Sequence, residues 1–254
     1  KEVALGSPLR DYSVFDKFEF ERKPIGIKFL LNKPDGLEKL DKDMAFCAMF
    51  AEAQGRSPFY AAQDNFACMG PLVLGMKDPE PIFESGQIGA KEKIYQEARA
   101  NRRIYQYLPK LAKNTVRYVA FSAVDQLSFD PDVLVITATP SQAEIILRAI
   151  TYSTGKMLST RSTPVISCAW IFVYPFISGE PNYTVTGLGY GLKTKKLLPE
   201  GYLLISIPYD LLPMVTENLE NMDWVLPMYS LSEEERGDYS QKVMQEINQE
   251  YANG

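Results

Sequence analysis

The segment that decides the fold runs from residue 116 to residue 152 and contains VRYVAFS (116–122), VLVIT (133–137) and PSQAEIILRAITY (140–152). The first two runs are short, apolar and rich in β-branched residues, which is typical of buried strands. Turn-forming residues at 128–132, SFDPD, separate them. The third run follows Thr139, and its first residue, Pro140, is typical of the first turn of a helix. This order indicates a sheet that is covered by helices.

Patterns elsewhere in the chain extend this sheet and its helical layers. Alternating or apolar runs predict strands at 24–31, 58–63, 183–192 and 202–208, and amphipathic spacing predicts helices at 44–54, 66–76, 91–108, 209–222 and 232–252. Residues 163–176 suit a helix, although their Ile and Val content would also suit a strand. We therefore expect an α/β or α+β fold, with a mixed sheet and flanking helices in a single compact unit over 1–254. Residues 1–23 are expected to be irregular, and 232–254 to form a C-terminal helix.

Composition limits the classes of partner. The 254 residues are 46% hydrophobic, so a large core can be buried, and 27 basic against 32 acidic residues give a net charge of −5. Because the basic residues are dispersed, we expect no nucleic-acid partner. Apolar runs such as 165–177 fall short of the roughly 20 residues of a membrane span, so no membrane partner is expected either. No signal peptide is visible, which predicts a cytoplasmic protein, and assembly into a homo-oligomer is left open.

The chain contains no histidine and three cysteines. The absence of histidine excludes Ser-His-Asp and Cys-His catalysis, zinc sites that use histidine, and haem held by histidine. Acid–base chemistry would have to use Asp, Glu, Lys, Tyr or Cys. No carboxylate pair has a recognisable catalytic spacing, so the sequence does not decide whether the protein is an enzyme.

The three cysteines are Cys47, Cys68 and Cys168. They are too few for a disulfide scaffold, and their spacing matches none of the local CxxC patterns of zinc or iron–sulfur sites. One interpretation is that they are small buried hydrophobic residues, and the other is that they form a metal or redox site. Cys68 is expected in the first turn of the helix at 66–76, after an Asp64-Asn65 cap, so it is the first thiol to test for reactivity.

Two backbone features could contact a cofactor. Pro140, Ser141 and Gln142 open a helix directly after a strand, where free N–H groups can face a ligand, although every α/β protein has such junctions. Gly187, Gly189 and Gly191 form G-x-G-x-G rather than G-x-G-x-x-G, and no helix is expected after them. A dinucleotide fingerprint is therefore not supported, and close backbone packing or a bulge is the alternative.

The order of these features resembles a known family. Phe46-Cys47, Cys68, the stretch DVLVITATPSQAEIILRAITYSTG (132–155), Cys168 and the glycine-rich segment before YLLISIP (202–208) resemble the uncharacterised prokaryotic family called domain of unknown function 169. The resemblance covers roughly residues 24–219. It implies a fold and a set of residues but no activity. It also implies a further cysteine at about Gly189 in other members, so that this chain would keep three of four thiol ligands.

Two functional hypotheses follow. In the first, Cys47, Cys68 and Cys168 converge to hold an iron–sulfur cluster or another thiolate-bound metal, or act as redox thiols. Three thiolates would leave one metal position open, or would mean that the role has been lost in this chain. In the second, the protein binds a small molecule or an organic cofactor without catalysis. The Pro140–Gln142 helix start and the Gly187–Gly191 segment would then form the rim of its pocket.

Overall fold

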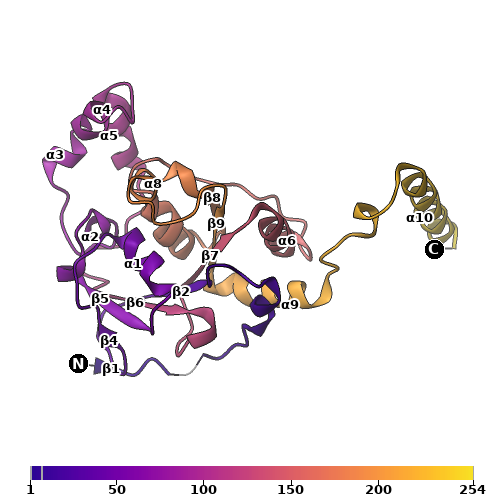
Figure 1. Ribbon diagram of the computed structural model, residues 1–254, viewed down its shortest axis with the longest axis horizontal. Coiled ribbons are helices and arrows are strands. Elements are labelled where there is room, and N and C mark those ends of the chain that lie inside the picture. Colours follow the sequence, from indigo (N-terminus) through magenta and orange to yellow (C-terminus); the bar gives the residue numbers. More distant parts are fainter. Residues whose placement is uncertain (1, 7, 254) are drawn as a thin grey trace. The chain divides into compact units, whose positions relative to one another are not determined.

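The structure, a computed structural model, describes residues 2–6 and 8–253 and comprises two units, Lys1–Glu220 and Asn221–Gly254. The first unit is built on a seven-stranded sheet (Figure 1). In spatial order its strands are β4 (Glu38–Lys39), β5 (Phe59–Ala62), β6 (Tyr118–Ala123), β2 (Ile25–Leu30), β7 (Val133–Ala138), β9 (Leu203–Pro208) and β8 (Asn182–Val185). In this sheet the described pairing of β4 with β5 is parallel and the other pairings are antiparallel, which makes the sheet mixed. The expected fold class is confirmed.

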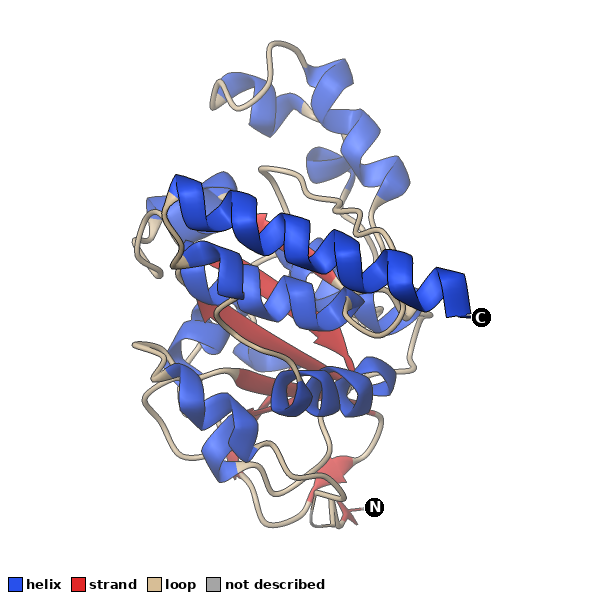
Figure 2. Ribbon diagram, turned by 90° about the vertical axis from the view of Figure 1, so that its right-hand side faces the viewer, coloured by secondary structure: helices blue, strands red, loops and turns tan. Residues whose placement is uncertain are grey.

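The middle of the sheet is buried on both faces. Ile25 of β2 lies opposite Ala123 of β6 and Val135 of β7, and all six residues of β7 are buried. A strand that is covered on both faces requires apolar residues at consecutive positions. This requirement explains the uninterrupted apolar run of β7, and Figure 2 shows the strands as one twisted layer.

One face of the sheet is covered by short helices. These are α1 (Phe46–Ala53), α2 (Gly70–Val73), the π-helical turn η4 (Ala169–Val173), α7 (Tyr174–Ser178) and α8 (Tyr190–Thr194). The ring of Phe46 joins this layer to the sheet, with centroid distances of 4.6 Å to Phe172 and 6.1 Å to Phe121. Aromatic pairs at such distances add packing energy beyond their buried area.

The other face carries longer helices, α6 (Pro140–Thr151) and α9 (Leu212–Asn221), the latter preceded by the 3-10 turn η6 (Tyr209–Leu211). The side-chain amide of Asn218 on α9 donates a 2.8 Å hydrogen bond to the carbonyl oxygen of Ala149 on α6. In Figure 1, α6 and α8 lie on opposite sides of β7 and β9. This separation of the helices decides which predicted site residues can meet.

Several predicted boundaries were wrong. The helix expected at 91–108 is two helices, α4 (Gln87–Lys91) and α5 (Ala98–Tyr107), which with α3 (Pro81–Glu84) form a helical hairpin. Lys93 has a φ of +58°, which ends α4, and Glu97 is extended before α5. Gly86 lets the two helices approach, because a Cβ there would lie 2.1 Å from the carbonyl oxygen of Ala98.

Two further elements near the cysteines also differ from the prediction. The helix expected at 66–76 is only α2, since Pro71 must lie in a first turn and Gly75, at φ +67°, ends the helix. The strand expected at 183–192 ends at Val185, and η5 (Thr186–Leu188) and α8 follow. The helical interpretation of 163–176 was correct, with η4 and α7 there.

The irregular N-terminal segment contains β1 (Glu2–Val3), which pairs with β3 (Lys33–Pro34), and η1 (Ser13–Phe18).

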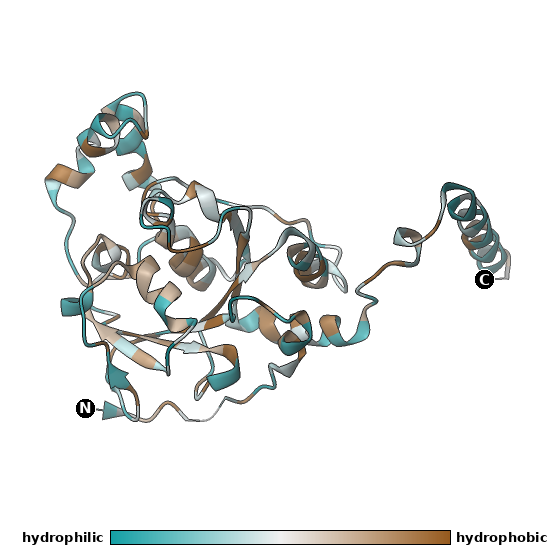
Figure 3. Ribbon diagram, in the orientation of Figure 1, coloured by the Kyte–Doolittle hydropathy of each residue, from teal (hydrophilic) through white to brown (hydrophobic). Residues whose placement is uncertain are grey.

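The second unit consists of η7 (Pro227–Tyr229) and α10 (Glu233–Asn253). Ser232 and Glu235 exchange hydrogen bonds as a capping box, which explains where α10 begins. Most of α10 is hydrophilic, as its teal colour in Figure 3 shows. Among the described helices of the whole chain, none has both the length and the apolar character needed to cross a membrane.

Candidate thiol site

The three cysteines lie at the starts of three helical segments on the same face of the sheet. Cys47 is the second residue of α1, Cys68 comes two residues before α2, and Cys168 directly precedes η4. Cys47 and Cys168 each pack against the core of that face, and Cys68 is exposed. The thiolates are close enough to influence one another's pKa, as described below. Folding therefore gathers thiols that are up to 121 residues apart in sequence (168 minus 47).

Cys68 is held by two backbone amides. Its Sγ accepts hydrogen bonds from the N–H groups of Phe46 and Gly70, both at 3.2 Å. These two N–H donors hold the sulfur in place next to the first residues of α1 and α2. Glycine is needed at position 70, because a Cβ there would lie 2.7 Å from the ring of Phe66 and 3.1 Å from the Cβ of Phe46. The close approach of this backbone thus brings the second N–H to the sulfur.

Cys47 is the protonated neighbour of Cys68. Burial, followed by the charge of Cys68, raises the pKa of Cys47 from an ordinary value near 9 to about 11. The ammonium group of Lys195, just after α8, acts in the opposite direction and lowers this pKa. Near neutral pH, Cys47 therefore keeps its proton unless a further positive charge arrives.

Strained backbone lies just before Cys168, whose own φ of −58° is helical. Burial raises its pKa well above the ordinary value, and the charges of Cys68 and Cys47 add to this effect. Two residues earlier, Ile166 has a φ of +51°, a conformation that is rare for a β-branched side chain, and the π-helical turn η4 follows at once. Strained residues and π-helical turns both cluster at functional sites.

Three thiols are a set of donors that suits a thiophilic metal. Their sulfurs, however, are not spaced as the ligands of one metal ion. In the described part of the chain, no three or more Cys, Asp or Glu side chains surround one point closely enough to hold a metal ion. A metal-bound form would require the sulfurs to move closer together. The three thiols are therefore near one another, but they do not have the geometry of a metal-coordination site.

Part of the glycine-rich segment lies against the thiols. A Cβ at Gly191 would be 3.9 Å from the Sγ of Cys47, and a Cβ at Gly189 would be 2.8 Å from the Oγ of Ser167, the neighbour of Cys168. The amide of Tyr190 donates a 2.8 Å hydrogen bond to the carbonyl oxygen of Pro164, which fixes α8 beside the strained turn. Gly187 differs, since a Cβ there would meet no atom within 4 Å. The segment opens the short helix α8, contrary to expectation.

The other predicted cofactor residues, Pro140, Ser141 and Gln142, begin α6 on the opposite side of the sheet (Figure 1). The Gln142 amide N–H donates to Thr139 Oγ1 at 3.3 Å, and Gln142 Oε1 accepts from the Thr139 N–H at 2.9 Å. The Nε2 group of Gln142 donates to the carbonyl oxygen of Phe18 at 3.0 Å. Gln142 is thus occupied with capping α6, and the structure does not bring this helix start to the glycine-rich segment.

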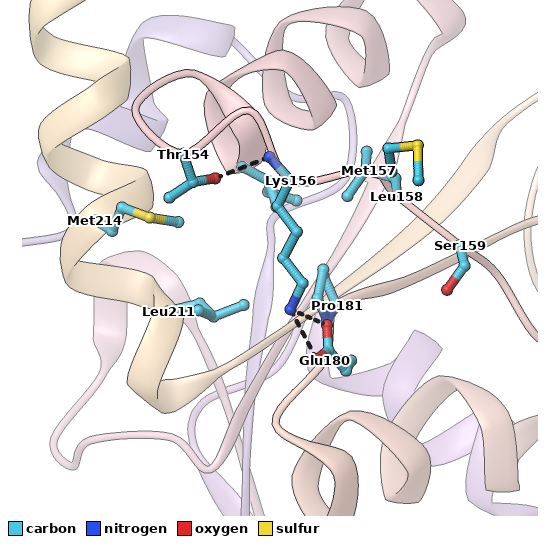
Figure 4. A pocket seen from close by; sticks show the side chains of 10 residues that line it. Thr154, Lys156, Met157, Leu158, Ser159, Glu180, Pro181, Leu211 and Met214 are labelled. Atoms are coloured by element: carbon cyan, nitrogen blue, oxygen red, sulfur yellow. Dashed lines mark hydrogen bonds and ion pairs between the residues drawn. The ribbon is translucent and has the colours of Figure 1, made fainter.

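A small hollow of about 70 Å³, partly open to solvent, lies at the other end of α6 (Figure 4). Lys156 crosses its mouth to an ion pair with Glu180 at 2.6 Å, and Met157, Leu211 and Met214 supply apolar walls. Pockets for small organic ligands usually measure about 300–1,000 Å³. The size of this hollow gives the small-molecule hypothesis no support.

Sequence reasoning missed several members of the thiol site. Lys195 belongs to the basic run 193–196, and only the fold brings it to Cys47. The N–H donors of Phe46 and Gly70 carry no side-chain signal, although Gly70-Pro71 directly after a cysteine marks a close helix start. The predicted Asp64-Asn65 cap was wrong, because Asn65 accepts from the Ala62 amide at 3.0 Å within the 3-10 turn η2 (Gln63–Asn65).

Comparison with known proteins gives one match. The family model described as uncharacterised ArCR, domain of unknown function 169, matches residues 15–218. These residues include all three cysteines, Lys195 and the glycine-rich segment. No curated protein and no solved structure matches the chain significantly.

Proposed function

The chain belongs to the family of domain of unknown function 169, and from the geometry of its thiols we propose that it binds a thiophilic metal centre, such as an iron–sulfur cluster, through Cys47, Cys68 and Cys168. The observation that carries the proposal is the pair of N–H hydrogen bonds on the exposed Cys68 sulfur, next to two thiols whose pKa values are raised by burial and then by the charge of Cys68.

Electrostatics supports this proposal. Three thiolates in one place repel one another, so without a cation at least two of them keep their protons. A bound metal cation supplies the missing positive charge and deprotonates the coordinating thiols. The N–H donors from Phe46 and Gly70 would then act as partners that orient and stabilise a sulfur ligand.

A second candidate function is redox exchange by the thiols themselves. Cys68 is the exposed thiol and Cys47 is its neighbour. A peroxide could oxidise Cys68 to a sulfenic acid with release of water or alcohol, and the Cys47 thiol could then attack that sulfur to form a disulfide and release water. For either function we propose a cytoplasmic location, where free thiols stay reduced.

Metal content after anaerobic purification tests the proposal. The wild type should retain metal and show a thiolate-to-metal absorption band, and Cys47→Ser, Cys68→Ser and Cys168→Ser should each lose most of both. Met69→Leu, which removes a sulfur beside Cys68 but keeps all three thiols, is the matched control and should behave as the wild type. A colourless wild-type protein that takes up no added iron, zinc or cobalt would overturn the metal proposal.

A further inference from the structure

A hollow on the helical hairpin is lined almost entirely by arginine. Its lining residues are Arg99, Arg102, Arg103 and Gln106 of α5, and its volume is about 430 Å³. They are spaced i, i+3, i+4 and i+7, so they lie along one face of the helix. All four side chains are exposed, and α5 turns its buried residue, Asn101, toward Gly86 and Gly89 of the hairpin.

Among the described residues, the three arginines have no acidic partner. None of them forms an ion pair or donates a hydrogen bond there, whereas Lys77, Lys110 and Lys113 nearby are each paired with a carboxylate. The guanidinium group of Arg103 lies over the ring of Tyr107, at 6.0 Å from its centroid. Like charges at i, i+3 and i, i+4 repel one another and destabilise a helix. A bound anion would remove this repulsion.

From this arrangement we propose that the arginine face of α5 binds a small ligand with two or more phosphoryl groups, such as pyrophosphate or the polyphosphate of a nucleotide. Guanidinium groups donate pairs of parallel hydrogen bonds that match the oxygens of a phosphoryl group. Three of them, with the amide of Gln106, provide more donors than one phosphoryl group can accept. The volume of the hollow lies in the range of small-ligand sites, and the net charge of −5 opposes a long nucleic-acid footprint.

Calorimetric titration of the full-length protein with inorganic pyrophosphate tests the proposal. Arg102→Gln/Arg103→Gln keeps the helix propensity of α5 and removes two guanidinium groups. Lys91→Gln/Lys113→Gln removes the same charge outside the hollow and is the matched control. We expect measurable binding by the wild type and the control, at least tenfold weaker binding by the arginine variant, and weaker binding at higher salt.

Three outcomes would overturn this proposal. They are no binding at millimolar pyrophosphate, equal loss in both double variants, and tighter binding of a single-stranded DNA 20-mer than of pyrophosphate through the same arginines. The last outcome would assign the face to nucleic acid instead. Circular dichroism of both variants shows whether α5 is retained, and an arginine variant that unfolds is replaced by the single substitution Arg103→Gln.

Discussion

The backbone amide of Phe46 donates a hydrogen bond to the Sγ of Cys68, 22 residues further along the chain, at 3.2 Å. This bond joins the first residue of α1 to the turn before α2 and places Cys68 beside Cys47. The same Phe46 side chain packs in the core against Phe121 and Phe172. The position of the Cys68 sulfur is therefore fixed by the hydrophobic core rather than by a flexible loop.

The first prediction concerns the order in which the thiols react. At pH 7.5 without metal, iodoacetamide should modify Cys68 first, because it is exposed while burial raises the pKa of Cys47 and of Cys168. Cys47, with its pKa raised to about 11, should react slowly, and its rate should rise about tenfold per pH unit until that pH is reached. Mass spectrometry of tryptic peptides measures each rate. Equal rates at pH 7.5 would contradict the described environments.

The second prediction concerns Gly70. Gly70→Ala should lower the free energy of unfolding by about 1–3 kcal/mol, because the new methyl group would overlap the ring of Phe66. It should also change the alkylation rate of Cys68, whose sulfur accepts from the Gly70 amide. Gly55→Ala is the control, since a Cβ there meets no atom within 4 Å, and it should cause no loss of stability. Urea unfolding of both variants measures the difference in the free energy of unfolding. Identical free energies for the two variants would contradict the close approach of Gly70 to Phe66.

The sheet could be predicted from the sequence because a strand that is buried on both faces is a continuous run of apolar residues. The apolar runs of β6 and β7 and the Thr139-Pro140 start of α6 were all recognised within two residues of their bounds. The division of 91–108 into two helices was not, since it depends on Lys93 at positive φ and on Gly86 approaching Ala98 across the hairpin. Such contacts between distant residues leave no periodic pattern.

The candidate site was predictable only in part, for the same reason. The cysteines could be chosen by residue type, but their neighbours depend on the packing of α1, α2, η4 and α8 on one face of the sheet. Lys195 directly follows α8, which places its charge near Cys47. The sequence predicted a strand at 183–192, and the start of α8 lies within that range. The local pattern of a ligand site is present at Pro140, Ser141 and Gln142. The fold, however, places these residues on the opposite face of the sheet from the thiols.

The third prediction concerns the position of a fourth thiol. Gly189→Cys alone should destabilise the protein, because its Cβ would lie 2.8 Å from Ser167 Oγ. Adding Ser167→Ala removes that oxygen but leaves the Cδ1 of Leu192 2.9 Å from the new Cβ, so the double variant should regain part of the lost stability. It should also bind cobalt(II) more tightly than the wild type through four sulfurs. Ser167→Ala alone is the control. Cobalt titration followed by visible absorption measures the affinities. If the double variant binds cobalt no more tightly than the wild type, the fourth thiol ligand does not belong at position 189.

The fourth prediction concerns Gln142. Gln142→Ala should lower the free energy of unfolding by about 0.5–2 kcal/mol, because the hydrogen bonds to Thr139 and Phe18 are lost. Metal content and thiol reactivity should not change, since α6 lies on the other side of the sheet from the thiols. Gln241→Ala on the exposed helix α10 is the control and should be nearly neutral. A loss of ligand binding at unchanged stability would instead give Gln142 a binding role.

The central claim is that three thiols act as one site, and protection of each thiol by metal tests it most directly. Alkylation of Cys47, Cys68 and Cys168 should be followed separately by mass spectrometry, in apo-protein titrated anaerobically with zinc or reconstituted with iron and sulfide. The account predicts that all three thiols become protected together, with the same dependence on metal concentration. Protection of Cys68 alone, or of none of the three, would contradict it.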